Sequence, residues 1–198
     1  MIRADIKSKS FNGTPVLGRV AFEIAPGETL ALVGPSGIGK STLLRILAGI
    51  DADFEGSVER PDALAFVFQE PTLLPWRSVL KNLLLPHPDL TQDQARDMLV
   101  RVGLEGKEGL FPGQLSLGQQ RRLSLARAFA QAPALLIMDE PFVSLDSETA
   151  EVMLRLTESL IADHRPATLF VTHDTREADR LADRTLTLRS HPGGAVID

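Results

Sequence analysis

The sequence of 198 residues contains no cysteine and no tyrosine, and it has a single tryptophan. The lack of cysteine excludes disulfide bonds, zinc–thiolate sites and a thiol nucleophile. The four histidines are scattered along the chain without the spacing of a metal site. No apolar run approaches the roughly 20 residues that a membrane span needs. We therefore expect any role at a membrane to depend on a partner protein.

A surplus of positive charge is also lacking, because 21 Lys and Arg face 26 Asp and Glu and leave a net charge of −5. This balance argues against broad nucleic-acid binding, so we expect no nucleic-acid partner. The N-terminal stretch carries an acid and has no apolar core, which is atypical of a secretory signal, so the prediction is a soluble cytoplasmic protein. The length and the 43% of hydrophobic residues predict one globular domain.

Apolar strands alternate with amphipathic helices along most of the chain. Ile2, Ala4 and Ile6 alternate with polar residues, and a second apolar segment covers 20–24, so we expect β-strands at the N-terminus. The later pattern predicts strands near 29–33, 63–68, 135–138, 168–171 and 185–188, and helices near 41–49, 117–130, 147–163 and 175–182. This alternation is typical of an α/β fold in which a parallel sheet is covered on both faces.

The composition changes between Pro71 and Pro112, where five prolines punctuate the chain. One helix is evident there, from about Thr91 to Val102, and we interpret the stretch as a small helical insert. The predicted organisation is one domain over 1–198. Within it, 1–69 and 113–198 form the core with its N-terminal strands, and 70–112 form the insert.

The eight residues from Gly34 to Ser41 read Gly-Pro-Ser-Gly-Ile-Gly-Lys-Ser and fit the phosphate-binding pattern G-x-x-x-x-G-K-[ST]. Glycines let backbone N–H groups surround a phosphate, the lysine adds positive charge, and the serine hydroxyl can ligate Mg²⁺. The loop lies between a predicted strand and a predicted helix, whose N-terminus favours an anion. An ordinary glycine-rich turn is the alternative, and binding of ATP or GTP is the stronger interpretation.

Two carboxylates, Asp139 and Glu140, follow the apolar strand predicted near 135–138. In open α/β sheets, ligands bind beyond the carboxyl ends of the strands. An Asp there can hold Mg²⁺, and a neighbouring Glu can polarise a water for attack on a γ-phosphate. Alone, the pair could equally be an acid cluster at a helix N-terminus. Beside a phosphate-binding loop, the functional interpretation is favoured.

The segment Leu115-Ser116-Leu117-Gly118-Gln119-Gln120-Arg121-Arg122 has the spacing of a capping box, in which Ser116 and Gln119 begin a helix. The capped N-terminus would present N–H groups and a positive dipole end to an anion. On spacing alone, a plain helix cap with a solvated basic face is the better interpretation.

Taken in order, these segments resemble the nucleotide-binding subunits of ABC transporters from about residue 2 to the C-terminus. In that family's terms, the Walker A loop is 34–42, the Q-loop 68–70, the signature 115–119, Walker B 135–140 and the D-loop 144–146, with His173 as the switch histidine. Phe11 lies 23 residues before Gly34, where the family places an aromatic residue that stacks on adenine. Alone, Gln69, Asp146, His173 and Phe11 could each be ordinary loop, cap or core residues, but their joint order is specific. The resemblance implies a P-loop ABC-type ATPase core.

The resemblance implies ATP and Mg²⁺ as cofactors and assigns roles to the motif residues. Lys40 and the backbone of 37–41 would hold the β- and γ-phosphates, and Glu140 would activate the attacking water. The implied catalytic residues are Lys40, Gln69, Glu140 and His173, and the implied residues of the Mg²⁺ shell are Ser41, Gln69 and Asp139. The residues expected to contact nucleotide are Phe11, Gly34, Pro35, Ser36, Gly37, Ile38, Gly39, Lys40, Ser41, Thr42, Ser116, Gly118, Gln119 and Asp146.

The same resemblance implies partners. Two copies would pair in an ATP-dependent homodimer, and two transmembrane permease subunits would dock near 70–86, at the cytoplasmic face of the inner membrane. Trp76 lies in that stretch, with filling of the insert's own core as the alternative. Leu-Leu-Pro-Trp at 73–76 and the segment after Ala182 are most similar to importer subunits of the nitrate, sulfonate and taurine group, which also work with a substrate-binding protein.

The sequence departs from the family at Leu117, where the signature usually has its first glycine, and at Phe11, which replaces the commoner tyrosine. We expect activity to survive the change at Leu117, with some reduction, because Ser116, Gly118 and Gln119 of the signature are intact. Phenylalanine at position 11 keeps the stacking face and loses only the hydroxyl. The alternatives are an ATPase of an export or lipid-extraction complex, a non-transport ABC protein acting on DNA or ribosomes, and a degenerate subunit that barely hydrolyses ATP. The chain has neither the long coiled-coil insertion nor the tandem cassettes that would favour the non-transport class.

Overall fold

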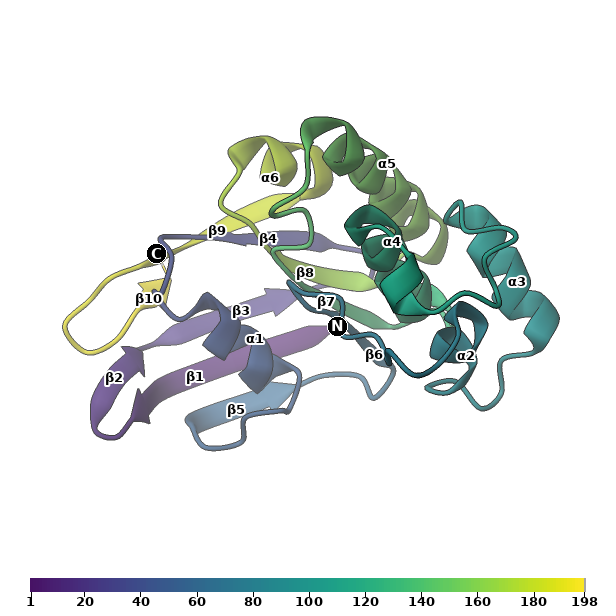
Figure 1. The fold of residues 1–198 in the computed structure, drawn as a ribbon. Helices are drawn as coiled ribbons and strands as arrows, with labels where there is room; N and C mark the ends of the chain where they lie inside the picture. The colour runs from purple at the N-terminus through teal and green to yellow at the C-terminus, as the bar shows by residue number, and fades with distance from the viewer. Residues whose placement is uncertain (198) are drawn as a thin grey trace. The chain divides into compact units, whose positions relative to one another are not determined.

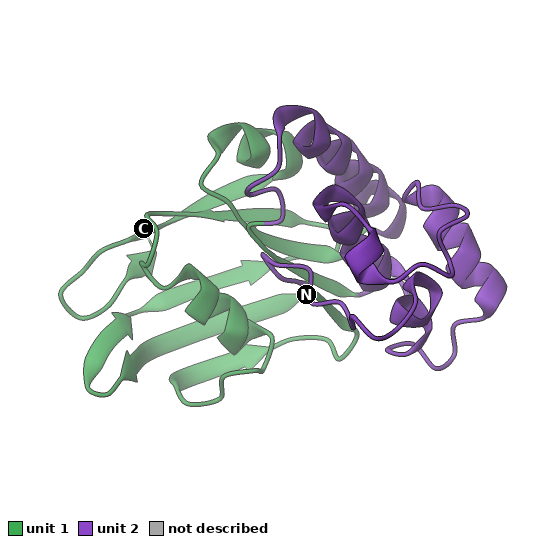
Figure 2. Cartoon of the chain, in the orientation of Figure 1, with its two compact units in different colours: residues 1–66, 134–140, 165–198 green, residues 67–133, 141–164 purple. Residues whose placement is uncertain are grey.

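The structure is a computed structural model that describes residues 1–197. The chain divides into two compact units, drawn in different colours in Figure 2. Unit 1 comprises Met1–Phe66, Ala134–Glu140 and the chain from Arg165 onward, and unit 2 comprises Val67–Pro133 and Pro141–His164. Unit 2 contains more of the chain than the insert expected over 70–112, whose boundaries stay a prediction.

Unit 1 is built on two sheets, and both contain strands that are far apart in the sequence (Figure 1). The first is antiparallel, with the order β2-β1-β3 and with β5 paired to β1. The second has the order β10-β9-β4-β8-β7-β6, and β9, β4, β8 and β7 run parallel to one another. The strands are β1 (Ile2–Phe11), β2 (Thr14–Leu17), β3 (Val20–Ile24), β4 (Thr29–Val33), β5 (Glu55–Glu59), β6 (Leu64–Val67), β7 (Leu135–Asp139), β8 (Ala167–Val171), β9 (Arg184–Arg189) and β10 (Val196–Ile197).

The core of unit 1 joins the two sheets through helix α1 (Lys40–Leu47). Leu43 and Leu47 of α1 are fully buried, as the spacing of apolar residues in this helix predicts. They pack in one cluster with residues of the antiparallel sheet, such as Ile6, and of the parallel strands, such as Leu30 and Ile137. Helix α6 (Thr175–Leu181) completes the helices of this unit. This packing holds the loop between β4 and α1 at the carboxyl end of a buried strand.

Unit 2 is helical. Its elements are α2 (Val79–Leu84), α3 (Gln92–Arg101), the 3₁₀ turn η1 (Pro112–Gln114), α4 (Leu117–Phe129) and α5 (Ser147–His164). Thr91 begins α3 with a capping box that includes Gln94. Val79, Leu99 and Leu123 are buried in a shared core of α2, α3 and α4. Within residues 1–197, no helix has both the length and the apolar character that a membrane span requires.

The structure confirms the predicted α/β architecture and adds elements that the sequence did not reveal. The additional elements are β2, β5, α2, η1 and β10. Strand β5 is almost wholly exposed. Its sequence, Glu-Gly-Ser-Val-Glu, has one apolar residue besides glycine and therefore lacks the apolar alternation that predicts a strand. Helix α2 has six residues, which is too short for helical periodicity to be read from the sequence.

Candidate functional site

The loop from Gly34 to Gly39 connects β4 to α1 and depends on glycine at two positions. A Cβ atom on Gly34 would lie 2.7 Å from the carbonyl oxygen of Leu188, which is closer than real contacts allow. Gly39 has a φ of 113°, in the left-handed region that side chains disfavour, and a Cβ there would lie 2.9 Å from Leu17. The glycines therefore let the loop pack tightly against its neighbours.

The side chain of Lys40 folds back over this loop. Its Nζ donates hydrogen bonds to the carbonyl oxygens of Gly34 (2.8 Å) and Pro35 (2.9 Å). Lys40 is only 5% exposed, so its ammonium group is placed inside the loop rather than in solvent. A buried ammonium group beside the backbone of a glycine-rich loop is the arrangement that binds a phosphate group.

Helix α1 begins at this loop with its N-terminus uncapped. Its N-cap residue is Gly39, which has no side chain that could accept a hydrogen bond from the first turn. The first N–H groups of a helix have no partner inside the helix, and the helix dipole favours an anion at that end. The structure therefore fits the phosphate groups of a nucleotide at the predicted place.

Asp139 ends β7 and lies next to Ser41, the second residue of α1. Burial raises the pKa of Asp139, and the negative charge of Glu140 raises it further, while the hydrogen bond with Ser41 and the charge of Lys40 oppose the increase. A divalent cation between these oxygen atoms would relieve the cost of burying the carboxylate. The hydroxyl of Ser41 and the carboxylate of Asp139 are oxygen donors of the type that Mg²⁺ prefers, so they fit this ion.

Glu140 follows Asp139 with a φ of 45°, an uncommon conformation for a residue other than glycine. Its backbone N–H donates to the carbonyl oxygen of Val171 at the end of β8. The carboxylate Oε2 lies 3.7 Å from Nδ1 of His173, and the imidazole is largely exposed. The structure therefore places a carboxylate and an imidazole together beyond the carboxyl ends of β7 and β8.

The capping box predicted at the signature segment is present at the start of α4. Ser116 accepts a hydrogen bond from the backbone N–H of Gln119, whose side chain accepts one from the backbone N–H of Ser116. Leu117 is 44% exposed, so its side chain does not fill the space beneath the helix. A Cβ on Gly118 would lie 2.7 Å from a methyl group of Thr149, which gives that glycine a packing role.

Asp146 caps α5. Its carboxylate accepts hydrogen bonds from the backbone N–H (2.9 Å) and the hydroxyl (2.7 Å) of Thr149. These hydrogen bonds lower the pKa of Asp146. In this structure the residue has the geometry of a helix cap, which was one of the interpretations left open by the sequence.

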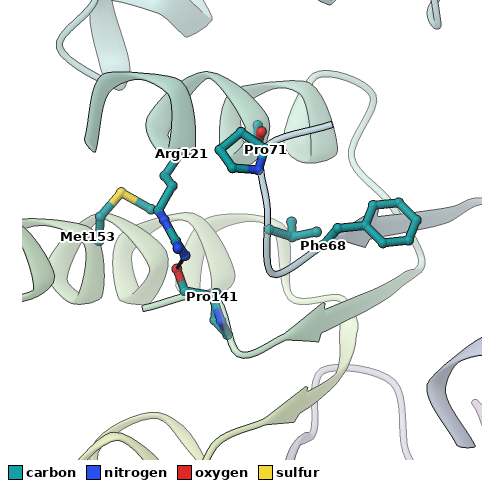
Figure 3. Close-up of a pocket in the computed structure, with 7 residues that line it drawn as sticks. Phe68, Pro71, Arg121, Pro141 and Met153 are labelled. Carbon is teal, nitrogen blue, oxygen red and sulfur yellow. Dashed lines mark hydrogen bonds between the residues drawn. The ribbon is translucent and has the colours of Figure 1, made fainter. Parts of the chain in front are cut away.

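Gln69 lies two residues beyond β6 and is exposed. The neighbouring Phe68 and Pro71 line a cavity of about 10 Å³ inside unit 2, which Figure 3 shows. Arg121 of α4 crosses this cavity and donates a hydrogen bond of 2.7 Å to the carbonyl oxygen of Pro141. Burial lowers the pKa of Arg121, and the charge of Glu70 opposes the decrease. The buried guanidinium of Arg121 is thus the point at which three parts of unit 2 meet: α4, the turn at Pro141 and the segment after Gln69.

That cavity also contains two polar atoms without a protein partner. The Nε atom of Arg121 and the hydroxyl of Ser124 are buried and have no hydrogen bond to residues 1–197. The cavity is about the size of one water molecule, and such a water commonly pairs with buried polar atoms. The space is therefore suited to a structural water.

Phe11 ends β1 at a hairpin and is 48% exposed. It pairs with Thr14 across the hairpin, whose second strand contains Val16 and Leu17. These two side chains are the neighbours that a Cβ on Gly39 would meet. The β1–β2 hairpin, whose first strand ends at Phe11, therefore packs directly against the phosphate-binding loop.

Trp76 is 66% exposed, so the interpretation that it fills the core of the insert is wrong. The loop that presents Trp76 is held by Asn82, which is buried. The Asn82 side chain accepts from the N–H of Leu74 and donates to the carbonyl oxygens of Leu74, Arg77 and Ser78. This network fixes the backbone of the loop that carries the exposed Trp76.

Within unit 1 the structure brings together Lys40, Ser41, Asp139, Glu140 and His173. Gln69, Ser116, Gly118, Gln119 and Asp146 belong to unit 2 and are described there. No feature of the linear sequence points to Lys9 or Asn82, and the solvated basic face expected at Arg121 is wrong for that residue, which is buried. Each is a polar residue that is buried in the structure, and no linear motif marks such a residue.

The fold and the loop define the class of protein, a nucleotide-binding P-loop ATPase. Residues 17–143 match the family described as ABC transporter, and the chain belongs to this family. Among solved structures, a dimeric ATP-binding cassette in a post-hydrolysis state, bound to ADP and Pi, superposes with a TM-score of 0.83 and 29% identity. The match covers 98% of this chain and 96% of that chain. The predicted ABC-type ATPase fold and ATP binding are confirmed.

The relatives point to one group within the family. The aliphatic sulfonates import ATP-binding protein SsuB 2 of Rhizobium johnstonii is 47% identical over 184 residues, which are 91% of this chain and 74% of that protein. SsuB 3 of Rhodococcus jostii, which has the same description, is 46% identical over 96% of this chain and 71% of its own length. These relatives confirm the resemblance to the nitrate, sulfonate and taurine group of importer subunits.

Proposed function

We propose that this chain hydrolyses ATP to power the import of an aliphatic sulfonate through a membrane transporter. The similarity to proteins named as aliphatic sulfonates import ATP-binding proteins carries this proposal, at 47% identity over 91% of the chain. The P-loop geometry supports the ATPase part, and the printed names of the relatives support the direction and the substrate class. The alternatives of an exporter, a lipid-extraction complex or a non-transport protein gain no support from these relatives.

In this proposal, ATP lies with its phosphates on the loop 34–39 and the N-terminus of α1. Lys40 would exchange its hydrogen bonds to Gly34 and Pro35 for the β- and γ-phosphate oxygens. This exchange requires little movement, because the ammonium group already lies inside the loop. The exposed ring of Phe11 would stack on the adenine, since its hairpin packs against the same loop.

Mg²⁺ would be held by Ser41 and Asp139, and the family resemblance adds Gln69 to its shell. When bound, the ion neutralises charge on the phosphate oxygens. The supporting observation is the contact between Ser41 and Asp139, with the raised pKa of that carboxyl. Both groups offer oxygen ligands without a change of fold.

Glu140 would act as the general base for the attacking water. As the water oxygen forms its bond to the γ-phosphorus, the carboxylate accepts the proton, and the bond to the departing ADP oxygen breaks. His173 would donate a hydrogen bond to the γ-phosphoryl group. The 3.7 Å approach between Glu140 and His173 supports a shared role at the reacting phosphate.

A second copy of the chain would complete the site. In the proposed homodimer, Ser116, Gly118 and Gln119 of one copy face the ATP bound to the loop of the other, with Asp146 near the same interface. The exposure of Leu117 supports this arrangement, because its side chain does not disturb the capping box behind it. Similarity to dimeric cassettes supports pairing of two copies.

Two permease subunits would dock on the stretch 70–86, at the cytoplasmic face of the membrane, in a transporter that includes a substrate-binding protein. The exposed Trp76 on a loop fixed by Asn82 supports this location. Tryptophan is enriched among the residues that dominate binding at the centre of protein interfaces. Leu85 adds a second exposed apolar side chain in the same stretch.

Uptake of a radiolabelled alkanesulfonate tests the proposal. The strain that encodes this chain should take up the compound, and deletion of the gene should abolish uptake. The wild-type gene should restore uptake, whereas Glu140→Gln should not, although its protein still binds ATP. Glu148→Gln, at an exposed position on α5, is the matched control and should restore uptake fully. Normal uptake in the deletion strain would refute the assigned substrate class.

A further inference from the structure

Lys9 lies in β1, two residues before Phe11, and its side chain is buried. Although it carries an ammonium group, Lys9 is only 2% exposed. Its Nζ lies 4.5 Å from the centroid of the Phe11 ring. This distance is within the roughly 6 Å at which a cation and an aromatic face attract each other. One face of the Phe11 ring is therefore occupied by a cation from its own strand.

Two aspartates hold the ammonium group in place. Lys9 donates hydrogen bonds to the carboxylates of Asp51 (3.0 Å) and Asp53 (3.3 Å), and also to the carbonyl oxygen of Asp53. Burial alone would lower the pKa of Lys9, but the hydrogen bonds with the aspartates outweigh it and raise the pKa. The hydrogen bond from Lys9 lowers the pKa of Asp51. The group therefore stays charged and fixed at neutral pH.

The backbone accounts for this unusual position of a lysine. The pairing of β1 with β5 is irregular between Ile6 and Ser8, and its pairing with β2 is irregular between Lys9 and Ser10. Such bulges re-aim a side chain relative to strict alternation. Here the irregularity between Ile6 and Ser8 adds one residue to β1, so that Lys9 points inward, and Phe11 is exposed at the end of the strand. The hairpin thus places a fixed cation next to an exposed ring and beside the phosphate-binding loop.

We propose that Lys9 is a positioning residue for nucleotide binding, which holds the Phe11 ring in one orientation before adenine stacks on it. The proposal rests on the role proposed above for Phe11. A ring that is already ordered loses less conformational freedom when a base binds, so binding is tighter. Lys9 touches the ring and not the nucleotide, so its effect on ATP passes through Phe11.

The test is a double-mutant cycle on the full chain, measured by calorimetric titration with ATP and with inorganic tripolyphosphate. The variants are Lys9→Met, Phe11→Ala and the double variant, and Lys7→Met on the same strand is the control at an exposed position. Lys9→Met should weaken ATP binding about two- to five-fold and leave tripolyphosphate binding unchanged. The double variant should bind ATP no more weakly than Phe11→Ala.

A purely structural role for Lys9 predicts a different pattern. An equal loss for ATP and tripolyphosphate, or additive losses in the double variant, would overturn the proposal. If Lys9→Met fails to fold, Lys9→Arg is the second test, and it should keep wild-type ATP affinity because it keeps the cation near the ring. Loss of affinity in a folded Lys9→Arg protein would overturn the proposal.

The role of Phe11 is tested separately in the same experiment. Unchanged ATP binding in Phe11→Ala would refute the adenine platform and, with it, the role of Lys9. Weakened ATP binding in Phe11→Ala together with unchanged binding in Lys9→Met would refute the role of Lys9 alone. The two failures are therefore distinguishable.

Discussion

Replacement of Asn82 by alanine should destabilise unit 2 and release the loop that presents Trp76. Asn82 is 1% exposed, and its side chain makes four hydrogen-bond contacts to the backbone of Leu74, Arg77 and Ser78. The amide has two N–H groups for three carbonyl oxygens, so we count about three full hydrogen bonds at about 1 kcal/mol each. The expected loss is about 3 kcal/mol of unfolding free energy.

For a chain of this size, a loss of about 3 kcal/mol corresponds to a decrease in Tm of roughly 6–12 °C. Differential scanning calorimetry should detect it, and hydrogen exchange should show faster exchange of the Leu74 N–H. Lys81→Ala, at the adjacent exposed position, is the matched control and should change the Tm by less than about 2 °C.

The affinity for ATP should stay within about two-fold in Asn82→Ala, because Asn82 and the phosphate-binding loop lie in different units. A decrease in Tm of less than about 2 °C would refute the inference that Asn82 holds the loop. Unchanged exchange at Leu74 would refute it as well.

Three further predictions concern the site and its partners. Lys40→Ala should weaken ATP binding at least about ten-fold in calorimetric titrations, since one charge-assisted hydrogen bond to phosphate contributes about 1.5–3 kcal/mol, and unchanged affinity would refute the P-loop assignment. Trp76→Ala should keep both Tm and ATP binding but reduce co-purification with the permease subunits of its own transporter, whereas normal assembly would exclude Trp76 from the docking surface. Hydrogen bonds from Thr149 lower the pKa of Asp146 below the usual value of 3.8, so its stabilising effect should be present above pH 3.8 and lost as the pH falls through that lowered pKa. The unfolding free energies of wild-type and Asp146→Ala proteins, measured with urea, should therefore differ at pH 6 and become equal at low pH. A difference that grows as the pH falls would contradict the role of Asp146 as a helix cap.

The phosphate-binding loop and its neighbours could be predicted from the sequence because their chemistry restricts residue type and spacing together. Glycine at 34 and 39 is required by close packing and by a left-handed φ, and Lys40 and Ser41 follow at fixed positions. The capping box of Ser116 and Gln119 is a local pattern, and it is present in the structure. Motifs of this kind depend on neighbouring residues, so the linear sequence contains them.

The residues that escaped prediction depend on contacts between distant parts of the chain or on irregular backbone. Lys9 is buried because the irregular pairing between Ile6 and Ser8 shifts the alternation of β1, and strict alternation gives no sign of this. Asn82 lies in a helix too short to show a period, and its partners are backbone groups in a loop. The exposure of Trp76 is likewise a tertiary property, because the same apolar sequence suits a core or a surface.

The central claim is that two copies of this chain enclose ATP, with the signature segment of each copy completing the other's site. Size-exclusion light scattering of Glu140→Gln protein tests it most directly, because this substitution should keep ATP binding and stop hydrolysis. We predict that the mass rises from 21.5 kDa to twice that value only when ATP is present. The claim would be contradicted if the Glu140→Gln protein remains a monomer with ATP bound and the Glu140→Gln/Leu117→Gly protein does so as well.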